Sequence, residues 1–215
     1  MLAVKKRRNS VSVGTRNYVA TVDYRFGGTL RRLVWRGVDT GLIREGCEYW
    51  RSDGDGRTHY EQEFGALHNI SVQERPDSVR VVSTAGLVSP QLQREGFACV
   101  GGEGVTRYDF YEDRIISESV MRPVFGYRIV DKYICWAPTA YQFVNGVPIG
   151  NPDTSGWWRA HVSRPCQVSS ATSWFGIDWT DGEIMAAVYR SETMLEVKPE
   201  YRDNQVLRME YRCGA

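Results

Sequence analysis

The segment from Gly46 to Phe64 concentrates the side chains best suited to acid–base chemistry. It includes one histidine, several carboxylates, two tyrosines, a tryptophan and two arginines. If its last six residues form a strand, His59, Glu61 and Glu63 lie on one face, because side chains alternate along a strand. Tyr60 then lies on the other face. An imidazole and a carboxylate can share the roles of general acid and base, so we predict these four residues as candidate catalytic groups.

The same segment offers groups that could hold a sugar. The ring of Trp50 could stack on a pyranose face, and Arg57 could pair with the carboxylate of an acidic sugar. In the enzymatic interpretation, His59 or Tyr60 removes a proton and a neighbouring glutamate orients it. The alternative is an exposed edge strand whose charges discourage aggregation.

A second cluster of polar and aromatic side chains lies at Trp157–His161. Adjacent tryptophans in a strand point to opposite faces, so Trp158 could stack on a ligand. Tyr141 and Gln142 precede it and are further candidate substrate-binding residues, and His161 is a candidate catalytic group. The alternative is that both tryptophans pack in the core or at an edge, since tryptophan is usually mostly buried.

Metal, nucleotide and serine-hydrolase sites find little support. Asp53–Gly56 carries two carboxylates, but a calcium loop needs further oxygen ligands at a fixed spacing that are not in place. The five cysteines are widely separated and lack the spacing of a zinc site. The sequence has no G-x-S-x-G elbow and no phosphate-binding glycine loop. We therefore predict neither a metal nor a cofactor.

Short alternating segments dominate the chain and predict an all-β fold. Tyr18–Tyr24 and Leu30–Trp35 are expected to form one hairpin, and Ser78–Thr84 a further strand. The clearest hairpin joins Val105–Tyr111 to Arg114–Met121, with β-branched and aromatic residues on both arms. No window sustains the spacing of an amphipathic helix, so any helix should be short.

Two more hairpins are expected near the C-terminus, around Asp181-Gly182 and Asp203-Asn204. The segments predicted to pair are Phe175–Trp179 with Glu183–Tyr189, and Leu195–Tyr201 with Val206–Tyr211. Glu45–Arg57 and Gly146–Gly156 are rich in glycine, aspartate or proline. They are expected to form long loops at the edges of a sandwich, where binding groups usually lie.

Length and charge favour one domain with a basic extension. A chain of 215 residues is long enough for a single sandwich or barrel. Five of its 27 basic residues precede Asp23, the first acidic residue, which leaves 22 bases against 26 acids in the remainder. We predict a flexible basic arm over residues 1–16 and a single β-sandwich domain over residues 17–215.

Membrane and secretion signals are not apparent. No run of about 18 apolar residues occurs, and residues 1–14 lack the apolar stretch of a secretory signal. The odd number of cysteines favours reduced thiols, and Cys135, within an apolar run, is expected to be a small buried hydrophobe. We expect a soluble protein, with the cytoplasm as the favoured compartment.

Two stretches resemble the galactose mutarotase-like β-sandwich found in sugar epimerases and as a domain of polysaccharide lyases and several glycosidases. They are Gly28–Gly37 and Val79–Leu87, the second leading into the hairpin over Val105–Pro123, and the resemblance covers about half of the chain. It implies an antiparallel β-sandwich, galactose mutarotase-like or jelly-roll-like, with little helix. It also implies a concave sheet face that holds a carbohydrate.

The resemblance further implies a histidine with a glutamate or tyrosine as proton-transfer groups. His59 with Glu61 or Glu63, and His161 opposite them, are the positions to which these roles are assigned. The implied function is a carbohydrate-active protein that binds a glycan, either without catalysis or as a lyase or epimerase working by proton abstraction.

A function of another class stays open beside the carbohydrate hypothesis. Sandwich folds also serve as capsid domains, and a basic arm can contact phosphates. In this alternative the chain is a structural subunit of a virion or phage shell. It would touch nucleic acid only through residues 5–16 and form an oligomer through its sandwich.

Overall fold

The computed structural model describes most of the chain. The described residues are 2–53, 56–97, 100–124, 129–137, 140–151, 156–162, 165–171, 174–179, 183–188, 193–198 and 206–214.

Nearly all regular structure in these residues is β-strand. The exceptions are a 3-10 turn, η1 (Tyr24–Phe26), and one short α-helix, α1 (Pro90–Arg94). Ser89 caps α1, and Pro90 occupies its first turn, where a missing N–H costs nothing. The prediction of an all-β fold with little helix is confirmed. Within the described residues, no helix is long and apolar enough to cross a membrane.

The strands form two hydrogen-bonded sheets, and every pairing between described strands is antiparallel. The first sheet has the order β1-β2-β3-β4-β5, with bounds Ala3–Arg7, Ser10–Gly14, Tyr18–Asp23, Thr29–Trp35 and Val38–Asp39. The second has the order β14-β13-β16-β17-β20-β11-β10-β9-β7-β6-β12-β19-β18-β15, with β8 paired to β9 beside this path. Its strands are β6 (Leu42–Asp53), β7 (Gly56–Glu61), β8 (Leu67–Glu74), β9 (Val79–Val88), β10 (Val100–Phe110), β11 (Ile115–Pro123), β12 (Ile129–Trp136), β13 (Phe143–Val144), β14 (Val147–Pro148), β15 (Trp158–His161), β16 (Cys166–Ser169), β17 (Trp174–Trp179), β18 (Glu183–Val188), β19 (Thr193–Lys198) and β20 (Leu207–Gly214).

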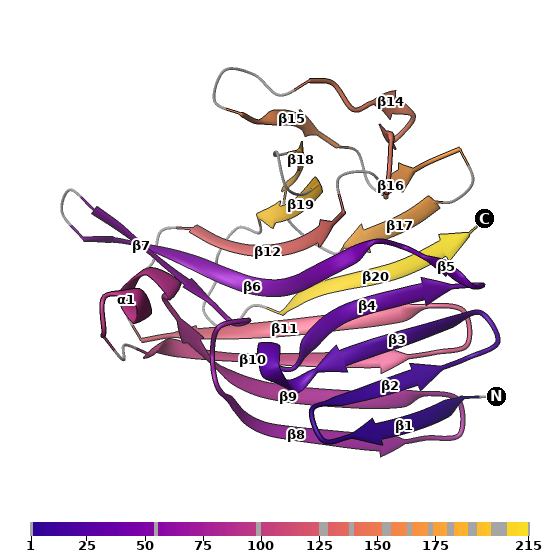
Figure 1. Cartoon of the computed structure of the whole chain (residues 1–215), viewed down its shortest axis with the longest axis horizontal. Coiled ribbons are helices and arrows are strands. Elements are labelled where there is room, and N and C mark those ends of the chain that lie inside the picture. The colour runs from indigo at the N-terminus through magenta and orange to yellow at the C-terminus, as the bar shows by residue number, and fades with distance from the viewer. Residues whose placement is uncertain are drawn as a thin grey trace.

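These strands stack in two layers around a core, as Figure 1 shows. One layer contains β1–β4 and continues through β6 and β12, and the other contains β8–β11, β20 and β17. Val11 and Leu33 of the first layer lie in the same buried cluster as Phe110 and Met209 of the second. Further along, Glu45 of β6 and Lys132 of β12 reach across the core to hydroxyl groups on β10, β11 and β20. The result is an antiparallel β-sandwich.

Two of the predicted hairpins are present. The β10–β11 hairpin pairs Phe110 with Ile115 at its turn, and β3 pairs with β4 through the reversal that contains η1. Both consist of adjacent strands with β-branched or aromatic residues on alternate positions, so the local pattern was sufficient to predict them.

The two hairpins predicted near the C-terminus are wrong. Strand β17 pairs with β16 and β20, not with β18, and β19 pairs with β12 and β18, not with β20. β17 and β20 belong to one layer, whereas β18 and β19 continue the other through β12. A turn dipeptide shows that the chain reverses direction, but the layer that each strand joins is decided by distant partners.

The long loop predicted over Glu45–Arg57 is also wrong. Almost all of it belongs to β6 and β7, which pair from Glu48 opposite Glu61 to Asp53 opposite Gly56. The glycines and aspartates of this segment predicted a loop, and the charge of Glu45 at an inward position interrupts the apolar alternation that indicates a strand. For Gly146–Gly156, the structure places only Val147–Pro148 in a strand, the two-residue β14, and residues 152–155 lie outside the described part.

The predicted flexible arm over residues 1–16 differs from the structure, which forms strands β1 and β2 there. Val11 and Val13 of β2 are fully buried in the core, and this burial ties the segment to the sandwich. Lys5, Lys6 and Arg7 lie along β1, the edge strand of the first sheet, and are exposed. Lysines on an edge strand discourage pairing with other chains, which is a structural reason for their position on β1.

The core encloses a buried ion pair between Glu45 of β6 and Lys132 of β12, 2.8 Å apart and each 1% exposed. Tyr108 and Tyr211 donate hydrogen bonds to the Glu45 carboxylate over 2.7 and 2.9 Å, and Lys132 donates to Ser117 over 2.7 Å. A buried charge is tolerated only when it is paired and hydrogen-bonded, and this network meets that condition. It ties the two layers together at one register.

The described cysteines are buried thiols, and no disulfide joins them. They are Cys47, Cys135, Cys166 and Cys213. Cys135 is completely buried, which confirms its expected role as a small hydrophobe.

Candidate functional site

The outer face of β6 and β7 carries a group of interacting charged side chains. Along β6, Glu45 faces the core, so Arg44 and Glu48 project from the other face. The register places Glu48 opposite Glu61 of β7, and His59 follows two residues earlier on the same face. We call the following residues the His59 cluster: Arg31, Arg44, Glu48, His59, Glu61 and Glu63.

His59 bridges two carboxylates at the centre of this cluster. Its Nε2 lies 2.5 Å from Glu48 Oε2, and its Nδ1 lies 3.1 Å from Glu61 Oε1. A carboxylate only accepts hydrogen bonds, so both ring nitrogens must carry protons to donate to the two partners. The geometry therefore indicates an imidazolium.

The electrostatics of the site favour the same protonation state. Burial by itself lowers the pKa of His59, but the hydrogen bonds and negative charges of Glu48 and Glu61 more than offset it and raise the pKa to about 9. The His59 side chain is still 22% exposed, so a solute can reach it. At neutral pH the His59 ring therefore carries a proton on both nitrogens.

Two arginines extend the cluster beyond the imidazole. Arg44 Nη1 lies 3.4 Å from Glu61 Oε2 and 2.5 Å from Glu63 Oε1, and Arg31 Nη1 lies 2.8 Å from the other oxygen of Glu63. Three carboxylates thus balance two guanidinium groups and one imidazolium, so the formal charge of the cluster is zero. A neutral ligand is better suited to such a site than an anion.

Tyr133 of β12 adds a polar group to the cluster. It stands opposite Gly46 in the register, and a Cβ atom on that glycine would lie only 2.7 Å from the tyrosine hydroxyl. Arg44 covers the ring, with its guanidinium carbon 5.0 Å from the ring centroid. The hydroxyl is buried and has no hydrogen-bond partner among the described residues. Burial, with the charges of Glu63 and Glu61, raises its pKa.

A metal is the other species that this geometry could hold. Glu48, His59 and Glu61 each offer one ligand atom, and these atoms lie within 4.8 Å of one another. A metal would have to displace the proton that the ring shares with these carboxylates, because histidine binds a metal through a deprotonated nitrogen. Arg44 also places a positive charge against Glu61. The same three groups can alternatively exchange protons with one another, since His59 contacts both carboxylates.

The structure separates the four catalytic candidates of β7 and its extension. His59 and Glu61 are in contact, and Glu63 joins them only through Arg44. Tyr60 points into the sandwich, 1% exposed, and stacks on Tyr49 with ring centroids 4.8 Å apart. Its hydroxyl lies on the face of β7 opposite the imidazole, as alternation requires.

The second predicted cluster does not join the first. His161 is exposed on β15, five strand spacings from β7, roughly 24 Å along the sheet. Trp158 is half-buried and packs against the core, and Tyr141 is buried edge-on against Trp136, with ring centroids 5.9 Å apart. Gln142 is exposed.

Two predicted substrate-binding residues are placed only by their backbone. Trp50 pairs with His59 across β6 and β7, and Arg57 pairs with Ser52. Both side chains lie outside the described part of the structure.

Sequence reasoning assigned no role to Arg31, Arg44, Glu48 or Tyr133. A signal was available for the residues of β6, because Arg44, Gly46 and Glu48 alternate with the core-facing positions of that strand. The expectation of a loop there concealed this alternation. For Arg31 and Tyr133 no local signal exists, since each reaches the cluster from a different strand.

Comparison with known proteins identifies the fold family of the sandwich. No family model and no curated protein matches the sequence. Among solved structures, an α-mannosidase from Enterococcus faecalis V583 is similar, with a TM-score of 0.69 and 8% sequence identity. The match covers 100% of this chain and 30% of the mannosidase. A galactose mutarotase-like protein from Clostridium acetobutylicum is also similar, with a TM-score of 0.56 and 7% sequence identity. This match covers 100% of this chain and 98% of the Clostridium protein. The chain has a galactose mutarotase-like fold.

This fold occurs in proteins of very different size. The chain spans 30% of the α-mannosidase and 39% of a 4-α-glucanotransferase from Thermococcus litoralis, which matches 100% of this chain with a TM-score of 0.52 and 8% identity. It spans almost the whole of the Clostridium protein. These proteins are named for carbohydrates, and at such identities the likeness establishes the sandwich alone.

Proposed function

We propose that the chain binds a neutral sugar at the His59 cluster and transfers a proton on it. The observation that carries this proposal is a protonated imidazole held between two carboxylates on a partly exposed sheet face. Proton transfer on a sugar needs one group that donates and another that accepts, at fixed positions. The fold supports the substrate class, since the structures that share it are named for sugars and glycans.

The proposed roles reverse those expected from the sequence. His59 is the acid, because its pKa of about 9 keeps it protonated at neutral pH. Each nitrogen of the His59 imidazole contacts one carboxylate. When a sugar oxygen takes the place of one of these carboxylates, the imidazole nitrogen that faced it donates its proton to the sugar oxygen. The carboxylate so released, Glu48 or Glu61, becomes the base and takes a proton from a sugar hydroxyl or carbon. One proton enters and one leaves, so the sugar keeps its charge.

The remaining groups of the cluster would hold the sugar. The hydroxyl of Tyr133, which has no hydrogen-bond partner among the described residues, can donate to a sugar oxygen, and Arg44 can donate to a sugar hydroxyl beside its contact with Glu61. Because the cluster is neutral, anomerisation or epimerisation of a neutral sugar is favoured over elimination on an acidic polysaccharide. The latter would require excess positive charge for the substrate carboxylate.

Anomer exchange of glucose, galactose and mannose, followed by NMR, tests the proposal. The chain should accelerate exchange of at least one of them, and His59→Asn should reduce that acceleration by about 10²-fold or more. His161→Asn is the matched control, because it removes a histidine from a distant strand and should leave the rate unchanged. Equal rates for the chain and His59→Asn would overturn the catalytic role. No binding of these sugars or their oligosaccharides would overturn the proposal altogether.

A further inference from the structure

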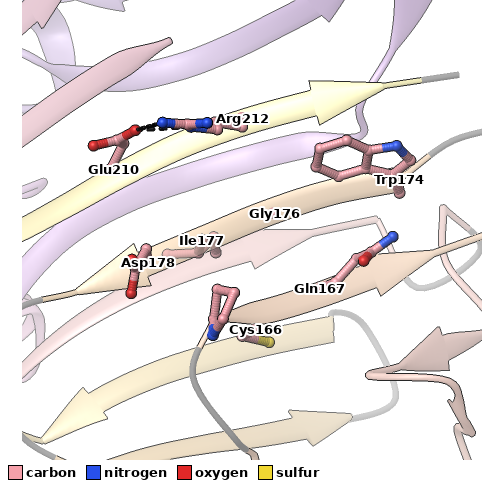
Figure 2. A pocket seen from close by; sticks show the side chains of 9 residues that line it. Cys166, Gln167, Trp174, Gly176, Ile177, Asp178, Glu210 and Arg212 are labelled. Carbon is pink, nitrogen blue, oxygen red and sulfur yellow. Dashed lines mark hydrogen bonds and ion pairs between the residues drawn. The ribbon is translucent and has the colours of Figure 1, made fainter.

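A separate hollow lies on the outer face of the other layer, over β16, β17 and β20. Its volume is about 410 Å³, within the range of small-molecule sites. Figure 2 shows the side chains of Gln167, Trp174, Asp178, Glu210 and Arg212 around the bare backbone at Gly176. The intervening residues of β17 point into the core, so this hollow and the His59 cluster lie on opposite outer faces of the sandwich.

Gly176 allows an indole ring to lie over the sheet. A Cβ atom at this position would come within 2.8 Å of Trp174 Cζ3, so any other residue would displace the ring. Trp174 is half-buried and presents an apolar plane beside the hollow. Apolar planes of this kind match the C–H face of a pyranose ring.

Polar groups surround this plane from two neighbouring strands. The register sets Gln167 of β16 and Arg212 of β20 opposite Gly176 on its two sides. Glu210 fixes the guanidinium, with its Oε1 2.8 Å from Nε and 2.7 Å from Nη2 of Arg212. An amide, a carboxylate and an oriented guanidinium offer both acceptors and donors, as sugar hydroxyls require.

The charge of the hollow selects against anions. Asp178 and Glu210 line it with two carboxylates, against the single guanidinium of Arg212. The hydrogen bond from Arg212 to Glu210, with the charges of that carboxylate, Asp113 and Asp178, raises the pKa of Arg212. An anionic ligand would meet the two lining carboxylates, and a phosphate or a uronic acid is therefore disfavoured.

We propose that this hollow, the Trp174 platform, is a second carbohydrate-binding site that takes a neutral pyranose unit stacked on the indole. Gln167 and Asp178 hydrogen-bond the sugar hydroxyls, and the Arg212–Glu210 pair closes one side. The platform does not depend on catalysis at the His59 cluster, because the two sites share no residue and face opposite directions.

Titration followed by the indole N–H resonance of Trp174, assigned from its loss in Trp174→Phe, tests the platform. The probes are methyl glycosides, disaccharides and trisaccharides of glucose, galactose and mannose, with a glucuronic acid disaccharide as the charged comparator. At least one neutral probe should shift the Trp174 resonance and bind more tightly than the charged one. No shift with any neutral probe, or tighter binding of the uronate, would overturn the proposal.

Three variants separate stacking on Trp174 from sugar binding elsewhere on the surface. Trp174→Ala should weaken binding by about tenfold or more, and Gly176→Ala, which keeps every polar group but displaces the ring, should weaken it similarly. Phe97→Ala is the matched control, since it removes an aromatic ring that is 60% exposed outside the hollow, and it should bind like the unmodified chain. Affinity unchanged in folded Gly176→Ala or Trp174→Ala would refute the platform.

The same titration on His59→Asn distinguishes the two sites. If the platform is real, the shift of the Trp174 resonance persists when the His59 cluster is disabled. If binding disappears in His59→Asn and survives in Trp174→Ala, the sugar binds only at the cluster. That result would overturn the platform and leave the proposed function standing.

Discussion

Glu48→Gln should release His59 from much of its raised pKa. In the folded chain the pKa is about 9, against an ordinary value of 6.5. This difference corresponds to roughly 3 kcal/mol in favour of the protonated ring. Glu48 provides the shorter of the two contacts, 2.5 Å against 3.1 Å for Glu61. Its loss should therefore lower the pKa by more than about one pH unit.

Removing both carboxylates reverses the sign of the shift. With Glu48→Gln and Glu61→Gln together, burial is the dominant remaining influence, and burial lowers the pKa of a histidine. The ring of the double variant should then titrate below 6.5. NMR titration of the imidazole carbon-bound protons measures both variants, and exposed His68 and His161 provide internal references whose signals should not respond to these substitutions.

Stability should follow the same linkage. Because the folded pKa is above the unfolded one, the stabilisation is fully present below pH 6.5 and is lost as pH rises through about 9. Urea unfolding across this range should show a loss of roughly 3 kcal/mol that is smaller in Glu48→Gln. A His59 that titrates near 6.5 in the unmodified chain, or a pKa that ignores the substitution, would refute the electrostatic reasoning.

Two further predictions concern the scaffold. Lys132→Met leaves Glu45 charged in the core without its ion-pair partner, and should cost about 3–5 kcal/mol in urea unfolding. Adding Glu45→Gln to Lys132→Met should recover part of this stability, because it removes the unpaired charge. If no stability is recovered, the loss does not come from a buried unpaired carboxylate. Gly65→Ala should prevent folding or cost more than about 3 kcal/mol, because its Cβ would overlap the carbonyl oxygen of Gly86. Gly37→Ala is the control, because Gly37 has φ 83° and no atom within 4 Å of an added Cβ, and it should cost only about 1–2 kcal/mol. Thermal or urea unfolding measures both variants. Equal losses of stability in Gly65→Ala and Gly37→Ala would disprove the steric argument.

Local patterns were sufficient for some features of the site. The alternation around His59 placed His59 and Glu61 on one face, and the structure shows them in contact. It also placed Tyr60 on the opposite face, where the structure shows it buried. These relations depend only on the period of a strand, which any extended chain obeys.

Charge at inward positions defeated the same reasoning on β6. Glu45 is buried because Lys132, Tyr108 and Tyr211 reach it from three other strands, each far away in sequence. The glycines and aspartates of Glu45–Arg57 predicted a loop, and the charged Glu45 at an inward position offered no apolar alternation against that prediction. Glu48, four residues after Arg44 on the outer face of β6, was therefore not predicted as a site residue.

The sequence by itself determined the strand period, the all-β class, the β3–β4 and β10–β11 hairpins and the face on which each β7 residue lies. These properties follow from steric rules that act over a few residues. Only the tertiary structure decided which layer β17 and β18 join, that Glu48 contacts His59, and that Arg31 and Tyr133 join the same group of side chains through Glu63 and Arg44, while His161 stays five strands away. Pairing between distant strands is set by the total burial and hydrogen bonding of the whole sandwich, which no short segment encodes.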